Sequence, residues 1–252
     1  MNGLQLRLTS APIVEAVVDI DCDMPNQVDV DALAGAAAAA LADGYPTQRR
    51  RMLSEHLISA APDQPLAVTS RHDLHALQYV STDEKQLIQF RPAGYSFNRL
   101  APYTTLDDYL SEIERTWRIF VNIAKPVVCR TIRLRYINRI QLPMVDTRVE
   151  IDGYLKLAPQ LADEQRLIFA GFFNQHSVLE PATGNQVNIV FATQPPAGDQ
   201  LPIIFDIEAY KEVAIDPGDW LTISGRIGSL RSLKNLVFAN SLTEKCLNLF
   251  RS

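Results

Sequence analysis

The residues whose types and spacing best suit chemistry are four arginines within ten positions of one segment, residues 129–142 (CRTIRLRYINRIQL). With the two-residue period of a β-strand, Arg133, Arg135 and Arg139 fall on one face. Asn138 falls on the other face, among apolar residues. A guanidinium presents a planar fork of hydrogen-bond donors that fits a carboxylate or phosphate group. The segment therefore predicts either an anion-binding surface or a row of internal ion pairs.

Two other segments carry carboxylates with the same period, residues 11–25 (APIVEAVVDIDCDMP) and residues 203–213 (IIFDIEAYKEV). Their polar faces carry Glu15, Asp19, Asp21, Asp206 and Glu208. Oppositely charged residues on neighbouring strands stabilise a sheet by roughly 0.2–1 kcal/mol per pair. The simplest interpretation is therefore a polar sheet face that is cross-linked by ion pairs.

The same charges would have another use if they lined a cavity. In that alternative, carboxylates hold a divalent metal ion and arginines bind phosphate oxygens, as in triphosphate-tunnel enzymes. The first strand would supply Glu15-x-Val17-x-Asp19, which departs from the alternating glutamates of those enzymes and lacks the lysine that completes their motif. The alternative function is thus a metal-dependent phosphohydrolase. A third alternative, a nucleic-acid-binding saddle, is disfavoured because the acidic rows would repel phosphates.

Two further groups of basic residues have simpler interpretations. The arginine run at 49–51 is typical of a solvated strand entry, although it would also widen a positive rim around Arg133 and Arg135. His72 and His75 are three residues apart, a spacing that would hold a metal ion only on a helical turn. Because no second pair of ligands accompanies them, we interpret both as surface or turn residues.

Composition sets the class of protein. The 252 residues carry a net charge of −5, with 47% hydrophobic and 21% charged residues, which is typical of a globular protein and argues against general nucleic-acid binding. No apolar stretch approaches the roughly 20 residues of a membrane helix, and the N-terminal segment lacks the pattern of a signal peptide. The three cysteines, Cys22, Cys129 and Cys246, are far apart, which argues against a disulfide framework or a paired-cysteine zinc site. We expect buried thiols in a cytoplasmic protein.

The elements that position these residues follow from capping signals and hydrophobic periods. An alanine-rich run predicts a helix that begins near residue 31 and ends at Gly44. A second helix follows the capping residue Thr105, with apolar residues every three or four positions up to Ala124. A last helix is expected to begin at Ser224.

Strand-like segments complete each half of the chain. Three lie between residues 50 and 100, the last of them at 85–100 (KQLIQFRPAGYSFNRL), and three more follow the arginine strand. The order predicts an α+β fold, a single domain over 1–252 whose pseudo-halves, about 1–126 and 127–252, are each β-α-β-β-β-α-like. We expect one wide, curved antiparallel sheet with long helices on one face. By analogy at the level of fold alone, this is TATA-binding-protein-like or helix-grip-like.

Three motifs also carry a resemblance: APIVEAVVDI at 11–20, FNRLAPYTTLDD at 97–108 and RLRYINRI at 133–140. On these motifs the chain resembles a sporadically distributed bacterial protein family of similar length, for which no activity is established. Leu106 departs from the aromatic residue that is usual at its position. The resemblance implies no catalytic residue, but it marks for testing Arg99, Tyr103, Arg135, Asn138 and Arg139.

The favoured function is a non-enzymatic binding or protein-interaction module that uses the polar sheet face. No catalytic residue, metal or cofactor is expected. The expected partner is an unknown protein or a small anionic ligand, whereas membrane and nucleic acid are not expected, and a homo-oligomer is left open. The candidate residues for ligand or anion binding are Arg99, Tyr103, Arg133, Arg135, Asn138 and Arg139.

Overall fold

The computed structural model describes residues 8–25, 29–59, 67–146, 148–163 and 166–251, without the side chains of 54–59 and 67–73. Within these residues, nine strands form one sheet with the order β2-β3-β4-β5-β1-β6-β9-β8-β7, and all neighbouring strands are antiparallel. The strands are β1 (Ile13–Asp23), β2 (Thr47–Ser59), β3 (Ala67–Val80), β4 (Gln86–Arg91), β5 (Gly94–Leu100), β6 (Val128–Pro143), β7 (Phe173–Glu180), β8 (Asn185–Thr193) and β9 (Gln200–Ile215).

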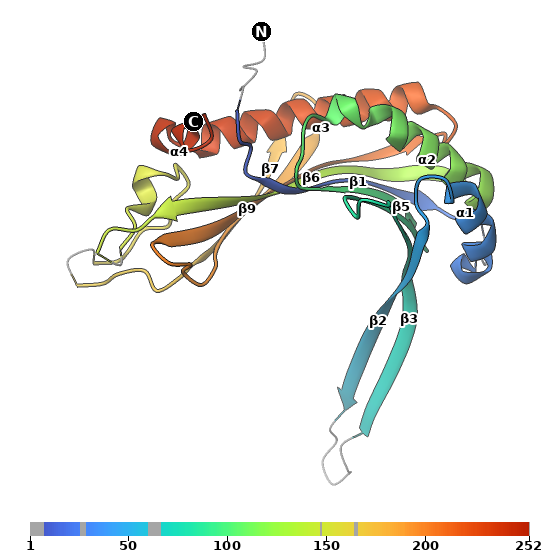
Figure 1. Cartoon of the computed structure of the whole chain (residues 1–252), viewed down its shortest axis with the longest axis horizontal. Coiled ribbons are helices and arrows are strands. Elements are labelled where there is room, and N and C mark those ends of the chain that lie inside the picture. Colours follow the sequence, from blue (N-terminus) through green and yellow to red (C-terminus); the bar gives the residue numbers. More distant parts are fainter. Residues whose placement is uncertain (1–7, 26–28, 60–66, 147, 164–165, 252) are drawn as a thin grey trace.

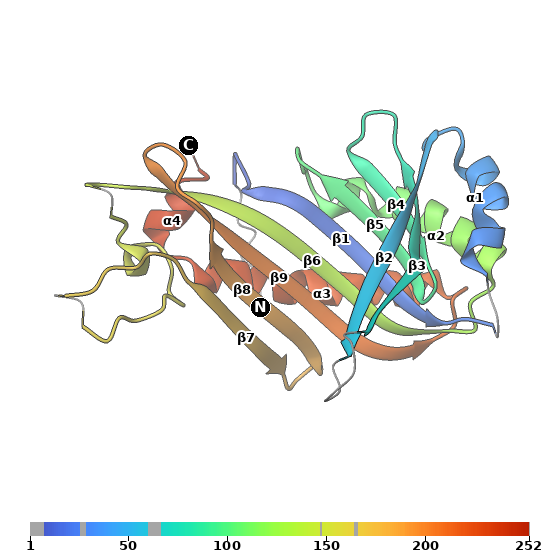
Figure 2. The same ribbon diagram turned by 90° about the horizontal axis from the view of Figure 1, so that it is seen from below.

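The helices cover one face of this wide, curved sheet (Figure 1). They are η1 (Val30–Leu33), α1 (Ala34–Leu41), η2 (Leu106–Asp108), α2 (Leu110–Ala124), η3 (Ile151–Gly153), α3 (Trp220–Ser241) and α4 (Glu244–Asn248). Helix α3 packs along β6, β8 and β9, α2 packs on β5, and α1 packs against α2 and β3. The hairpin β2–β3 projects from the opposite side of the sheet (Figures 1 and 2). The architecture is the α+β fold that the sequence predicts.

Helix α2 begins where its capping signal predicts. Thr105 and Asp108 form a capping box around the short helix η2, which leads into α2. Trp117 is buried, and its indole N–H donates to the Pro217 carbonyl at 3.0 Å, which ties α2 to the segment before α3. The helix ends at Lys125, which adopts the left-handed conformation of a C-terminal cap (φ 51°).

Helix α3 begins at Trp220, and not at Ser224 as the sequence analysis predicts. The Asp219 side chain caps the helix by accepting a backbone N–H. Gly225 and Gly228 lie inside the helix. Glycine costs a helix about 1 kcal/mol relative to alanine. The apolar side chains that α3 buries against the sheet outweigh this cost.

Residues 86–100 form two strands, β4 and β5, where the sequence analysis predicts one. The chain reverses at the turn between Arg91 and Gly94, and Gly94 has a φ of +145° that glycine alone adopts readily. A Cβ atom at Gly94 would lie 2.1 Å from the Ile20 carbonyl oxygen of β1. This close approach lets β5 pair with β1. Because the turn divides the predicted strand in two, the first half has one strand more than expected.

The alternation predicted for the arginine strand is confirmed. Along β6, the even-numbered positions from Ile132 to Leu142, Asn138 among them, are buried toward the helices, and the arginines lie on the opposite, polar face. Each half places its last strand beside its first, because β5 pairs with β1 and β9 pairs with β6. The internal duplication itself stays a prediction. No helix in the described part of the chain has the length and apolar character to cross a membrane.

Candidate functional site

The acidic and basic rows meet on the polar sheet face because β1 and β9 flank β6. Arg133 lies opposite Asp19 in the register and forms an ion pair with the neighbouring Asp21. The Arg135 Nε donates to both carboxylate oxygens of Asp206, at 2.9 and 3.0 Å. Hydrogen bonding to Asp206 raises the pKa of Arg135. The structure therefore contains the row of ion pairs that the simplest interpretation predicts.

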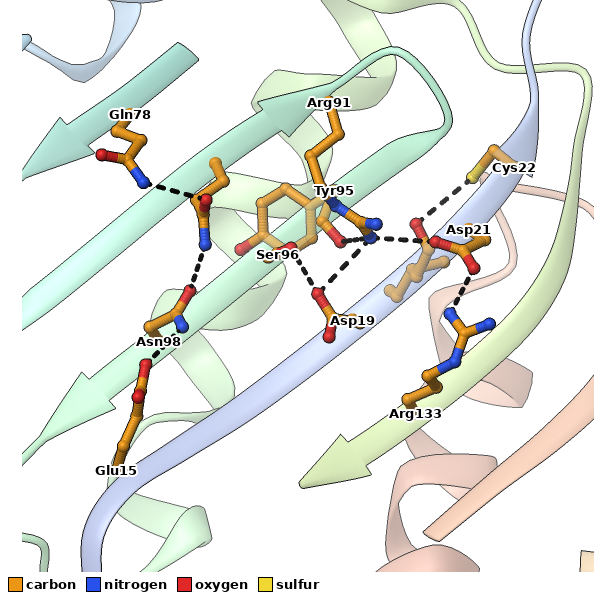
Figure 3. A network of polar contacts seen from close by, with 12 residues as sticks. Glu15, Asp19, Asp21, Cys22, Gln78, Arg91, Tyr95, Ser96, Asn98 and Arg133 are labelled. Carbon is orange, nitrogen blue, oxygen red and sulfur yellow. Dashed lines mark hydrogen bonds and ion pairs between the residues drawn. The ribbon is translucent and has the colours of Figure 1, made fainter. Parts of the chain in front are cut away.

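Arg91 of β4 adds a cation that the sequence analysis missed. Its guanidinium reaches across β5 and lies 3.4 Å from Asp19 and 3.0 Å from Asp21 (Figure 3). Asp21 thereby joins Arg91 to Arg133, on strands at either side of β1. The Nε atom of Arg91 is buried and has no hydrogen-bond partner among the described residues. One donor at this junction is therefore left without an acceptor.

A chain of side-chain amides holds Glu15 in place. Gln78 donates to Gln89 at 3.1 Å, Gln89 donates to Asn98 at 3.0 Å, and Asn98 donates to a Glu15 oxygen at 2.7 Å (Figure 3). Gln89 and Asn98 are both buried. Because each donor meets an acceptor, the chain fixes the orientation of the Glu15 carboxylate.

A cavity of about 260 Å³, called the polar cavity below, opens on this face and is lined by residues of the six strands β1 to β6. Asp19 in its wall also accepts a hydrogen bond from the Ser96 hydroxyl. Both signs of charge therefore meet around one space. The charged and titratable lining residues are Glu15, Asp19, Arg51, His75, Arg91 and Arg135.

His75 stands beside two of these arginines. It lies within β3, and not in a turn, while the side chain of His72 lies outside the described residues. Partial burial and the positive charges of Arg51 and Arg91 lower the pKa of His75. Neighbouring charges of the same sign disfavour the protonated form of histidine. This wall of the cavity is therefore a region of positive potential, which an anion would neutralise.

Two of the predicted ligand residues lie near the start of α2, on the helix side of the sheet. The Tyr103 hydroxyl forms a hydrogen bond of 2.7 Å with the Tyr136 hydroxyl. The Arg99 guanidinium lies over the Tyr109 ring, 5.2 Å from its centre. These contacts join β5 and β6 to the segment that leads into α2, so Arg99 and Tyr103 lie away from the polar cavity.

Asn138 and Arg139 also lie outside the polar cavity. Asn138 is buried toward the helices, and its Nδ2 donates to the Phe205 carbonyl at 2.9 Å. Arg139 is exposed and is absent from the cavity lining. Of the six predicted ligand residues, the structure brings only Arg133 and Arg135 together with the acidic rows, and only Arg135 lines the cavity.

The carboxylates do not converge on one point. Glu208 accepts from Asn188 of β8 at 3.1 Å, whereas Glu15 and Asp19 are bound to β5. Within the described ranges, no group of three or more His, Cys, Asp or Glu side chains is placed to hold a metal ion. This geometry gives no support to the alternative of a metal-dependent phosphohydrolase.

A larger cavity of about 690 Å³ lies beneath the connection between β6 and β7. Its walls combine apolar residues such as Leu155 and Phe169 with charged residues such as Glu150 and Lys156. We favour the polar cavity as the site because charged groups and amides from six strands converge on it, and convergent polar groups are what orient a ligand.

A recognisable signal existed for the residues that the sequence analysis missed. Within one continuous strand, Arg91 and Ser96 would fall on opposite faces because one number is odd and the other is even. The turn at Pro92–Ala93 changes this relation and places both side chains on the polar face. The Arg-Pro-Ala-Gly sequence is a turn signal that predicts the change.

Comparison with protein-family models and curated proteins gives no match, so the function is inferred from the geometry of the site. The resemblance based on the three sequence motifs therefore stays a prediction.

Proposed function

We propose that the protein is a non-enzymatic binding module that holds a small anionic ligand in the polar cavity. One observation carries the proposal: Arg51 and Arg91 line the cavity together with His75, and their positive charges contribute to lowering the pKa of that histidine. A carboxylate or phosphate group bound there would accept hydrogen bonds from these side chains and offset the positive potential around His75.

The opposite wall restricts the ligand further. Glu15 and Asp19 accept hydrogen bonds from Asn98 and Ser96, and a carboxylate has about four lone-pair sites, so further donors have room to bind. The volume of about 260 Å³ lies below the range of roughly 300–1,000 Å³ for drug-sized ligands. The proposed ligand is thus a small molecule that carries one anionic group and one or more hydroxyl or ammonium groups.

The experiment screens small anions against the purified protein by thermal shift, with phosphate, citrate, hydroxy acids and free amino acids as probes. A ligand at 100 times its Kd adds about 2.7 kcal/mol of apparent stability. Titration calorimetry then compares three variants with the wild type. Arg51→Gln and His75→Gln remove cavity donors, and each should weaken binding about tenfold, since a hydrogen bond to a charged group contributes about 1.5 kcal/mol or more.

Arg139→Gln is the matched control, because Arg139 is an exposed arginine on the same sheet face but outside the cavity. Its affinity should equal that of the wild type. Two results contradict the proposal: no probe shifts the melting temperature, or Arg139→Gln weakens binding as much as Arg51→Gln. Chromatography of the ligand after incubation tests the non-enzymatic part, which fails if the ligand is converted.

A further inference from the structure

Cys22 and Cys129 are more than a hundred residues apart in sequence, yet they lie directly opposite one another where β1 ends and β6 begins. The register shifts next to this pair, which leaves Arg130 as the extra residue of a β-bulge. Arg130 is exposed and pairs with Asp23. The bulge brings Cys129 onto the core face, so Cys22 and Cys129 are 7% and 0% exposed.

Backbone hydrogen bonds show whether the two cysteines form a hydrogen-bonded or a non-hydrogen-bonded pair of the antiparallel ladder. The Cys22 N–H donates to the Ala93 carbonyl of the β4–β5 turn at 2.8 Å, so it points away from β6. On the other side, the Asp23 carbonyl accepts from Val127 at 2.8 Å. The cysteines are therefore a non-hydrogen-bonded pair, in which Cα atoms are about 4.5 Å apart. That separation falls within the roughly 4.4–6.8 Å that a disulfide bond spans.

We propose that Cys22 and Cys129 form a reversible disulfide bond between β1 and β6 by exchange with a small disulfide such as glutathione disulfide. The Cys22 sulfur attacks one sulfur of glutathione disulfide and releases the first glutathione as a thiolate. The Cys129 sulfur then attacks the Cys22 sulfur and releases the second glutathione. The two cysteine thiols lose two protons and two electrons, and one glutathione disulfide becomes two glutathione molecules. This proposal does not rest on ligand binding in the polar cavity.

The surroundings of the pair predict slow exchange. A hydrogen bond with Cys129, burial and the charge of Asp21 raise the pKa of Cys22, while Arg91 opposes them. Since the thiolate is the attacking species, the closed structure suppresses the first step. Ends of strands open locally at low free energy, and both cysteines lie within two residues of a strand end. Exchange should therefore proceed through opening of this end and should accelerate at alkaline pH.

The experiment incubates the native full chain with glutathione disulfide at mildly alkaline pH, quenches with acid and counts thiols after denaturation. The count should fall from three to one per chain and return to three with dithiothreitol. Peptide mapping without reduction should find one linkage, between the peptides of Cys22 and Cys129. Cys246→Ser is the matched control, because Cys246 is also fully buried but lies in α4. In that variant the count should fall from two to zero with the same linkage.

Measurements on the wild type decide the proposal even if a variant does not fold. A count that stays at three after prolonged incubation overturns it. Stable glutathione adducts on Cys22, a linkage that includes Cys246, or a linkage between chains overturn it as well. Cys22→Ser, if folded, should lose the linkage and retain both remaining thiols. Cys129→Ser, if folded, should lose the linkage and keep a glutathione adduct on Cys22, because no second thiol is present to displace it.

Discussion

Lys234 of α3 is a buried lysine, and its replacement tests how burial of a charged group affects the free energy of unfolding. Its side chain is 9% exposed, and its ammonium lies 3.9 Å from the centre of the Tyr136 ring on β6. Burial, together with the positive charge of Arg231 one turn earlier, lowers the pKa of Lys234 from 10.5 to about 7. Arg231 itself is paired with Asp107 at 2.7 Å, and Tyr136 is hydrogen-bonded to Tyr103. No described carboxylate forms an ion pair with Lys234 to compensate its burial.

The magnitude follows from the two values of the pKa. A drop from 10.5 to about 7, at about 1.4 kcal/mol for each tenfold loss of proton affinity, makes the folded state about 4–5 kcal/mol less stable at pH 7. Attraction between the ammonium and the Tyr136 ring returns about 2 kcal/mol. Methionine fills the same space without charge. We therefore expect Lys234→Met to raise the free energy of unfolding at pH 7 by about 2 kcal/mol, or the Tm by about 4–8 °C.

The sign of the pH dependence gives a second readout. Between the folded pKa of about 7 and the unfolded value of 10.5, the unfolded chain binds more protons at Lys234 than the folded chain does. Through this group, the stability of the wild type should rise with pH across that window. In Lys234→Met this contribution is absent, so the difference between the two proteins should shrink from pH 7 toward pH 10.

Urea unfolding at several pH values from 6 to 10 measures both effects. Lys85→Met is the control, because Lys85 is exposed in the turn before β4, and its stability should match that of the wild type at each pH. The reasoning fails if Lys234→Met is less stable than the wild type at pH 7. It also fails if the difference between the two proteins does not change with pH.

Three further predictions concern the sheet. If an anion binds beside His75, it will raise the pKa of that histidine, so calorimetry should show affinity that increases as the pH falls, and the increase should vanish in His75→Gln. Asp21→Asn leaves two half-buried arginines with a weaker acceptor and should lower the free energy of unfolding by about 1–3 kcal/mol; an unchanged urea midpoint would contradict the bridging role. Gly94→Ala places a Cβ atom 2.1 Å from the Ile20 carbonyl and should cost about 3 kcal/mol, whereas a neutral result would show that β1 and β5 separate easily.

The sequence by itself determined which side of β6 most residues occupy. Alternation along a strand is a local property of the backbone, so the burial of Asn138 and the outward direction of Arg133 and Arg135 were predictable from residue type and period. The start of α2 was predictable for the same reason, since the capping box of Thr105 and Asp108 involves neighbouring residues.

Only the tertiary structure decided which of these residues meet. The strand order places β1 between β5 and β6, and this order brings Arg91 to Asp21 and groups the walls of the polar cavity. A one-residue bulge brings Cys129 opposite Cys22. The physical reason is that pairing between distant strands depends on register and on packing of the whole core, and a shift of one residue exchanges the two faces of a strand. Local sequence patterns do not determine which distant strands pair or in which register.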